Sequence, residues 1–294
     1  MYVEQFIKYL KEEKRLTGNS LDAYKRDIEM FQKYCDSRGI DDLINVENTD
    51  VVAYLLHLSE TGKSPSTSNR KLASIRAFYK YAIEQGVVSK NPAANVKAPK
   101  IERKEIEFLT VDEVETLLSM PEGKNPKDLR DKAILELMYA TGIKVNELIA
   151  ANVEDINLRI GFFTCPGIIG KARIVPIGRM ARQAIEVYLK EARDVLVKDN
   201  LDERALFVNF YGNRMSRQGL WKILKSYGKK AGLEDKITPH ILRNSFAVHM
   251  VQNGADLKSL QELLGHEDIS ATQIYLSVMK NRIKDVYDNT HPRA

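Results

Sequence analysis

The chain has 294 residues, and 45 Lys and Arg against 40 Asp and Glu give it a formal net charge of +5. Its 44% apolar and 29% charged residues are ordinary for a folded protein and exclude a disordered chain or a low-complexity array. The length suggests two domains, and no apolar run approaches the roughly 18 residues that a transmembrane helix needs. The two cysteines show no metal-binding spacing and fit a reducing cytoplasm. The net charge permits a nucleic-acid partner without requiring one.

The N-terminal part of the chain is expected to form helices throughout, because apolar residues recur there at helical spacing. The stripes are Phe6, Tyr9 and Leu10; Leu21, Tyr24, Ile28 and Phe31; Val51, Tyr54, Leu55 and Leu58; and Leu72, Ile75, Phe78, Tyr79 and Ala82. After them, residues 96–107 alternate charges with few apolar side chains, a pattern typical of an exposed linker. We therefore expect a helical domain at residues 1–95, a linker at 96–108 and a second domain at 109–294.

The second domain is predicted to be mainly α with a small β-sheet. Thr110 and Glu113 form a capping-box pattern ahead of an apolar run, and another helix is expected at residues 126–142. Two short β-type runs, 160–165 and 172–177, bracket a turn that contains Pro and Gly and predict a hairpin. Beyond them the pattern is helical again.

Polar side chains gather at the helix starts of this domain. Thr238, Pro239 and His240 fit the first positions of a helix. His240 and Arg243 then share one face near the positive end of that helix. Such a face suits an anion, above all a phosphate.

Two more candidates follow closely. Gly265 ends a predicted helix and places His266 on a tight turn, and the capping box at Ser270–Gln273 puts Tyr275 on the next helix. Two histidines, an arginine and a tyrosine at successive helix ends suggest a site built round a phosphodiester. Taken singly, each residue is better explained by a structural or solvated role. The histidine spacing matches no zinc site, so we expect no metal.

The order of these pieces resembles the tyrosine recombinase (phage integrase) family, and the last residues resemble its Xer-type members. The matching stretches are Ala140–Leu148, Pro239–His249, Leu263–Tyr275 and Tyr287–Ala294. The resemblance implies an N-terminal four-helix core-binding domain and a C-terminal α+β catalytic domain with a subunit-docking tail. It implies site-specific cutting and rejoining of double-stranded DNA through a 3′-phosphotyrosine, for chromosome-dimer resolution or for integration and excision of mobile DNA. The implied assembly is a tetrameric synapse with itself or a related recombinase, without cofactor or membrane.

The resemblance also assigns roles to single residues. Tyr275 takes the position of the nucleophile, and Arg243 that of one of two arginines that neutralise the phosphate. His240 and His266 take positions that hydrogen-bond the phosphate or manage the tyrosine proton.

Two catalytic positions depart from the family pattern. Lys144 stands in place of the other arginine and keeps its charge without the bidentate fork. Ile168 stands in place of the hairpin lysine that protonates the leaving 5′-oxygen, and Lys171 substitutes only if the turn is re-registered. Asn244 stands where histidine is usual. We therefore expect Xer-type chemistry with reduced or absent strand transfer, because each such group typically contributes about 10²–10⁴-fold.

Both domains are expected to contact DNA through basic and polar helix faces, which fit a major groove. The candidates are Asn19, Ser20, Tyr24, Arg26, Asn69, Arg70, Lys71 and Arg76 in the first domain, and Arg214, Arg217, Gln218 and Lys222 in the second. A solvated charged face is the alternative explanation for part of this set.

Two other functions stay open at this point. One is a DNA-binding protein of the same fold that has lost catalysis and acts as partner or regulator at a recombination site. The other is a helical phosphodiesterase or topoisomerase-like enzyme that uses Tyr275 without strand exchange. A requirement for paired sites and four subunits distinguishes recombination from relaxation.

Overall fold

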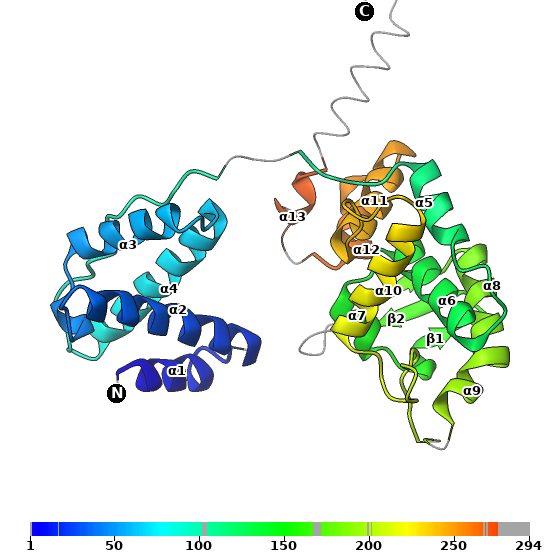
Figure 1. Ribbon diagram of the computed structural model, residues 1–294, viewed down its shortest axis with the longest axis horizontal. Coiled ribbons are helices and arrows are strands. Elements are labelled where there is room, and N and C mark those ends of the chain that lie inside the picture. The colour runs from blue at the N-terminus through cyan, green and yellow to red at the C-terminus, as the bar shows by residue number, and fades with distance from the viewer. Residues whose placement is uncertain are drawn as a thin grey trace, which may run out of the picture. The chain divides into compact units, whose positions relative to one another are not determined.

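The computed structural model describes residues 2–16, 18–101, 105–166, 172–198, 200, 202–266, 268 and 270–275. The chain folds into two compact units, Met1–Lys104 and Glu105–Ala294. In Figure 1 the first unit runs from blue to cyan and the second from green to orange. The boundary between them falls within residues 96–108, where the sequence predicted a linker. Each unit has a hydrophobic core of its own.

The first unit is helical. Its elements are α1 (Tyr2–Glu12), α2 (Gly18–Ser37), the 3₁₀ turn η1 (Leu43–Asn45), α3 (Asn48–Glu60) and α4 (Pro65–Glu84). α4 begins where Ser64 accepts a hydrogen bond from the Thr67 amide at 3.2 Å, and Pro65 fits the first helical position. The predicted stripes meet in one core, in which Phe6 and Ile75 have no exposed surface. Burying each such side chain stabilises the fold by about 1.5–3 kcal/mol.

The start of the predicted linker packs on this unit. Val96 is buried, and Arg76 donates hydrogen bonds to the carbonyl oxygens of Ala93 at 3.0 Å and Val96 at 2.6 Å. Asn69 donates to the Pro99 carbonyl at 3.0 Å. The sequence pattern missed this docking, because a single valine among charged residues gives no apolar stripe and its anchoring donors lie on α4.

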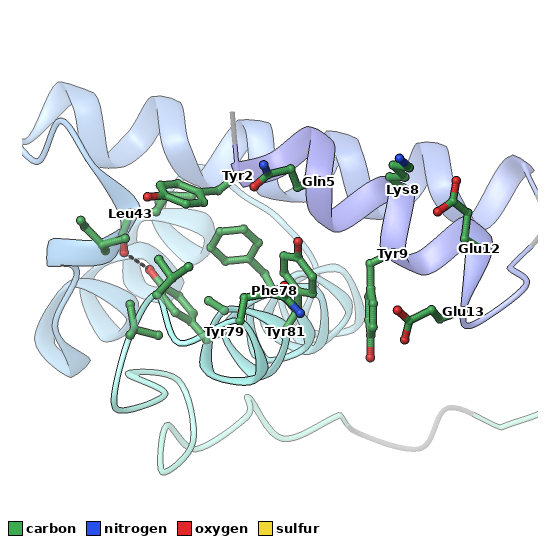
Figure 2. A pocket seen from close by; sticks show the side chains of 15 residues that line it. Tyr2, Gln5, Lys8, Tyr9, Glu12, Glu13, Leu43, Phe78, Tyr79 and Tyr81 are labelled. Carbon is green, nitrogen blue, oxygen red and sulfur yellow. Dashed lines mark hydrogen bonds between the residues drawn. The ribbon is translucent and has the colours of Figure 1, made fainter.

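A hollow of about 430 Å³ lies beside the core of the first unit. Figure 2 shows its aromatic lining, to which α1 contributes Tyr2 and Tyr9 and α4 contributes Phe78 and Tyr79. The Tyr79 hydroxyl donates to the Leu43 carbonyl at 2.7 Å, which ties α4 to η1 at one end of the hollow. None of the residues implied in chemistry lines this hollow.

The second unit is mainly helical with a small sheet, which confirms the predicted fold class. Its elements are α5 (Val111–Ser119), α6 (Pro126–Thr141), α7 (Val145–Ala150), η2 (Val153–Asp155), β1 (Ile156–Asn157), β2 (Phe162–Cys165), β3 (Arg173–Pro176), α8 (Arg179–Val187), the π-helical η4 (Tyr188–Arg193), α9 (Asp194–Val197), α10 (Arg217–Lys230), α11 (Pro239–Gln252), α12 (Leu257–Leu264) and α13 (Ser270–Gln273). The predicted capping box of α5 is confirmed, since Thr110 accepts from the Glu113 amide at 3.2 Å and Glu113 accepts from the Thr110 amide at 2.8 Å.

The sheet has three antiparallel strands in the order β1-β2-β3. Across β2 and β3, Phe163 pairs with Val175 and Cys165 with Arg173. Phe163, Cys165 and Val175 are buried, so alternate residues of these strands face the core. The two strands of the predicted hairpin are confirmed, and its turn, residues 167–171, lies outside the described residues. β1 is too short to leave a pattern in the sequence.

No helix in the described part of the chain is long and apolar enough to cross a membrane. Among the residues that the structure describes, no group of His, Cys, Asp and Glu could hold a metal ion. Cys35 and Cys165 are both free and buried, and burial raises the pKa of each thiol to about 12, which makes both unreactive.

Candidate active site

The start of α11 places Arg243 in the interior. The predicted cap is confirmed, because Thr238 accepts a hydrogen bond from the Ile241 amide at 3.1 Å with Pro239 in the first turn. Arg243 lies one turn further and is only 7% exposed. Burial lowers the pKa of its guanidinium to about 10, so Arg243 still carries its charge at neutral pH. His240 lies on the exposed side of the same first turn.

The guanidinium of Arg243 joins two helix ends. It donates to the carbonyl oxygen of Gly142, which ends α6, and to that of Leu264, the last residue of α12, at 2.6 Å. Gly142 is in the left-handed region, with φ 55°, and a Cβ atom there would collide with the ring of Phe246. Only glycine fits this position, and the helix end that it forms presents the Gly142 carbonyl to Arg243.

His266 is the third partner of Arg243. Its Nε2 lies 3.0 Å from the Arg243 Nη2, and its Nδ1 lies 2.9 Å from the Thr272 hydroxyl oxygen. An arginine only donates, so His266 Nε2 accepts, and Nδ1 carries the proton and donates to Thr272. Burial, and then the charge of Arg243, lower the pKa of His266 to about 4. His266 is therefore neutral at pH 7.

Tyr275 lies inside this unit and is 2% exposed. Its hydroxyl donates to the Oδ1 atom of Asn244 at 3.0 Å, and the Asn244 Nδ2 atom donates to the Glu107 carbonyl at 3.1 Å. Burial raises the pKa of Tyr275, and the charge of Arg243 only partly opposes this. In this structure the Tyr275 phenol is neutral, and its hydroxyl proton is engaged in the hydrogen bond to the amide oxygen of Asn244.

Lys144 reaches the same turn from the N-cap position of α7. Its Nζ donates to the Gly265 carbonyl at 2.9 Å and lies 4.0 Å from Glu147 Oε1. Its backbone amide donates to the other Glu147 oxygen at 2.9 Å. The lysine that stands in place of an arginine is therefore beside His266, with its side chain 45% exposed.

A buried ion pair that sequence reasoning missed supports this turn. Arg173 of β3 donates to both oxygens of Glu147, at 2.6 and 3.0 Å, and to the Leu263 carbonyl at 2.7 Å. Burial by itself raises the pKa of Glu147, but the bonds from Arg173 and Lys144 outweigh it and hold that pKa below its usual value. The pair joins α7, β3 and α12. Its partners are 26 residues apart, so only the fold reveals it.

The structure thus brings together Lys144, Arg243, His266 and Tyr275 of the residues predicted from sequence. Glu147, Arg173, Asn244 and Thr272 complete their contacts. Ile168, Lys171 and residues 276–294 lie outside the described residues.

The DNA candidates of the first unit divide into exposed and internally paired groups. Lys71 is buried, 3.1 Å from Asp27, and Arg70 also pairs with Asp27 while half of its side chain stays exposed. Asn69 and Arg76 hold the residues after α4, as described above. Asn19 and Arg26 are exposed, Ser20 is half-buried, and Tyr24 packs edge-on against Phe6, a member of the core.

The DNA candidates of the second unit surround the start of α10. Arg214 is turned inward and donates to the carbonyl oxygens of Ile149 at 2.9 Å and Ala151 at 3.0 Å. Arg217 is exposed and donates to the side chain of Asn146 at 2.7 Å, close in sequence to Lys144. Gln218 and Lys222 are exposed on the same helix. Arg217 and Lys222 therefore place exposed positive charge on α10, and Arg217 contacts Asn146, two residues after Lys144.

Two family models match the chain: "Phage integrase family" over residues 107–282 and "Phage integrase, N-terminal SAM-like domain" over residues 3–86. A "Tyrosine recombinase XerD" from Oceanobacillus iheyensis is 45% identical over 294 residues, covering 99% of this chain and 98% of that protein. The protein of that name from Listeria innocua is 43% identical over 293 residues and covers 99% of both. The solved XerH site-specific recombinase in its post-cleavage complex with a palindromic difH substrate has a TM-score of 0.78 at 21% identity. The match covers 97% of this chain and 83% of the XerH chain, and it shows that the two proteins share a fold.

Proposed function

Because the chain belongs to the phage integrase family, among its Xer-type tyrosine recombinases, we propose that it cuts and rejoins double-stranded DNA at a specific site through Tyr275. The observation that carries this is the contact of Arg243 with His266 at the turn that Lys144 also reaches. Arg243 contacts His266, Lys144 reaches the residue before His266, and Tyr275 is bonded to Asn244, the residue after Arg243. Such an arrangement fits the charge and the proton transfers of a phosphodiester reaction.

In the proposed reaction the Tyr275 oxygen forms a bond to phosphorus as the bond to the 5′-oxygen breaks. The phenol loses its proton, and the leaving 5′-oxygen takes up a proton. The phosphotyrosyl link keeps the energy of the phosphodiester, so a second 5′-hydroxyl can reverse the step without a nucleotide cofactor.

Arg243 is the group best placed to neutralise the phosphate. A guanidinium has five N–H groups, and three of the bonds that Arg243 makes go to Gly142, Leu264 and His266. Its two other N–H groups have no acceptor among the described residues, so they remain for phosphate oxygens. Its fixed position requires little reorganisation when charge develops.

Lys144 is expected to do less than an arginine would. An ammonium is a point charge without the planar fork that grips two oxygens, and this one already donates to Gly265 and neighbours Glu147. We propose that strand transfer by this chain is slow for that reason. The alternative is the inactive DNA-binding partner, which has the same fold and the same exposed Arg217.

A suicide duplex carrying the recombination site of a XerD-named relative tests this proposal. We expect a covalent protein–DNA adduct that Tyr275→Phe abolishes and the control Tyr139→Phe, in the same unit, retains. Lys144→Arg should speed its formation about tenfold or more. Tight DNA binding with no adduct from the parent chain or Lys144→Arg would favour the inactive partner instead.

We further propose that the chain works in the cytoplasm on the chromosome, in a synapse of four subunits. The free, buried Cys35 and Cys165 suit a reducing compartment. Full-length similarity to XerD-named proteins favours resolution of chromosome dimers over movement of mobile DNA. Recombination of two sites on one plasmid, with and without a related recombinase added, tests the partner requirement.

A further inference from the structure

The side chain of Asn244 connects the proposed nucleophile to the stretch of chain that arrives from the first unit. We call Glu105–Leu109 the junction segment. We propose that Asn244 is a positioning residue that holds Tyr275 at rest and couples its release to movement of the junction segment. This inference rests on the proposed function of Tyr275.

Both ends of the Asn244 amide are engaged. The Nδ2 atom donates to the Glu107 carbonyl at 3.1 Å, which turns the Oδ1 atom towards Tyr275 at 3.0 Å. Asn244 is 5% exposed and Tyr275 is 2% exposed, so water does not replace either bond while the helix ends stay packed. A single orientation of the Asn244 side-chain amide therefore makes both bonds, one to the Glu107 carbonyl and one to the Tyr275 hydroxyl.

The junction segment also packs on the cluster that contains the tyrosine. Ile106 and Phe108 lie against the cluster formed by Phe246, Leu264, Tyr275 and their neighbours. The Leu109 amide donates to the Ser245 hydroxyl at 2.8 Å, one residue after Asn244. Moving the junction segment would therefore remove a hydrogen bond from Asn244 and apolar cover from Tyr275 together.

Release is a necessary step for catalysis. A phenol that donates to an amide inside the protein cannot bond to a phosphate on bound DNA, so the contact between Tyr275 and Asn244 must break first. The junction segment begins the second unit and follows in sequence on Lys104, the last residue of the first. Capture of DNA by the first unit would then move Glu107 and break its bond to the Asn244 side chain. The Asn244 amide could then rotate and release the hydroxyl of Tyr275.

Amide hydrogen exchange of the full chain without DNA tests the resting contact. Asn244→Ala should speed exchange in residues 270–275 about tenfold. The matched control is Asn253→Ala, which removes a side-chain bond to the His249 carbonyl at the other end of α11 and should leave those residues unchanged. Unchanged exchange at 270–275 in a folded Asn244→Ala protein would overturn the proposal.

A second variant tests the coupling and covers a failure of Asn244→Ala to fold. Asn244→Asp keeps an oxygen for Tyr275 but sets another oxygen against the Glu107 carbonyl. We expect faster exchange in both the junction segment and residues 270–275. Faster exchange in the junction segment alone would show that the two are independent.

Catalysis supplies the last readout. At saturating suicide DNA, Asn244→Ala should form adduct several-fold faster than the parent chain, with unchanged affinity for DNA. A slower rate would mean that Asn244 serves the chemistry itself and would contradict a resting role. If the parent chain forms no adduct, the proposed function fails, whereas the exchange experiments still decide whether Asn244 holds Tyr275.

Discussion

Arg243 and His266 share a hydrogen bond of 3.0 Å, and its direction determines which nitrogen of the histidine carries the proton. Since the guanidinium has no lone pair to offer, the His266 Nε2 atom must accept, and the Nδ1 proton must point at Thr272. The site therefore rests with a cation bound to a neutral imidazole. If a bound phosphate accepts the Arg243 N–H that now points at His266, the Nε2 atom of His266 would need a new hydrogen-bond partner.

The first prediction concerns the charge of His266. We expect its pKa at about 4 in the DNA-free protein, because burial and the Arg243 cation both disfavour the imidazolium. The ordinary value is 6.5, so between pH 6.5 and 4 the His266 side chain is protonated in the unfolded chain but not in the folded protein. This contribution therefore costs stability as the pH falls from 6.5 towards 4.

Nuclear magnetic resonance of ¹⁵N-labelled histidine measures this pKa directly. Arg243→Gln should raise it, although not to the ordinary value, since burial is the larger cause. Lys258→Gln, a change at an exposed residue of α12, serves as the control. A His266 that titrates at or above 6.5 in the parent chain would contradict the geometry of its bond to Arg243.

The second prediction concerns Thr272, which has no exposed surface and accepts from the His266 Nδ1 atom. Thr272→Val keeps the shape but leaves that N–H unpaired, which should cost about 1–3 kcal/mol of unfolding free energy. Adduct formation should slow about tenfold, because the imidazole loses one of the two hydrogen bonds that fix the orientation of its ring. Thr116→Val, which removes an exposed hydroxyl bond on α5, should change neither quantity.

A pH–rate profile separates positioning from simple destabilisation. If Thr272 positions the imidazole, the profile of Thr272→Val should change in shape as well as in height. A profile that is only scaled down would indicate that the threonine acts through stability alone.

The third prediction concerns the pair of Glu147 and Arg173, whose side chains are 8% and 16% exposed. Glu147→Gln should lower the unfolding free energy by about 3 kcal/mol at pH 7, because it leaves Arg173 without its counter-ion. The carboxyl pKa is held below its usual 4.5, so this stabilisation is complete above that value and is lost as the pH falls through the lower, folded-state pKa.

Urea unfolding at pH 7 and at pH 4 measures this dependence. The difference between the parent chain and Glu147→Gln should shrink at the lower pH. Glu186→Gln, which breaks the exposed pair between Glu186 of α8 and Lys190 of η4, should leave the unfolding curve unchanged at both values. An equal effect of the two substitutions would show that the buried pair contributes no more than a surface pair.

Local patterns were enough to predict most of the long helices and several residues of the candidate site. The caps at Thr110 and Thr238 depend on neighbours three residues away, and both are present as expected. The motif order likewise selected Arg243, His266 and Tyr275, which lie together.

Partners distant in sequence could not be predicted in the same way. Lys71 looked like a DNA contact, but Asp27, 44 residues away, draws it into the core of the first unit. Arg173 and Asn244 depend on helix and strand packing that no single segment encodes. Charged side chains with buried partners are therefore where sequence reasoning failed most.

The fourth prediction separates the two kinds of basic residue found among the DNA candidates. Arg217 is exposed at the start of α10, whereas Lys71 is buried against Asp27. Arg217→Ala should weaken DNA binding and reduce the slope of log Kd against log salt by about 0.9, the value for one phosphate contact. Lys71→Met should lower the stability of the first unit, because it removes one partner of a buried carboxylate.

Fluorescence anisotropy with one labelled duplex over a range of KCl concentrations gives both slopes. For Lys71→Met the slope should equal that of the parent chain once binding is measured below its melting temperature. A reduced slope for Lys71→Met would mean that the lysine leaves Asp27 to reach the DNA backbone. An unchanged slope for Arg217→Ala would instead remove the start of α10 from the DNA-binding surface, because a lost phosphate contact must release fewer counter-ions.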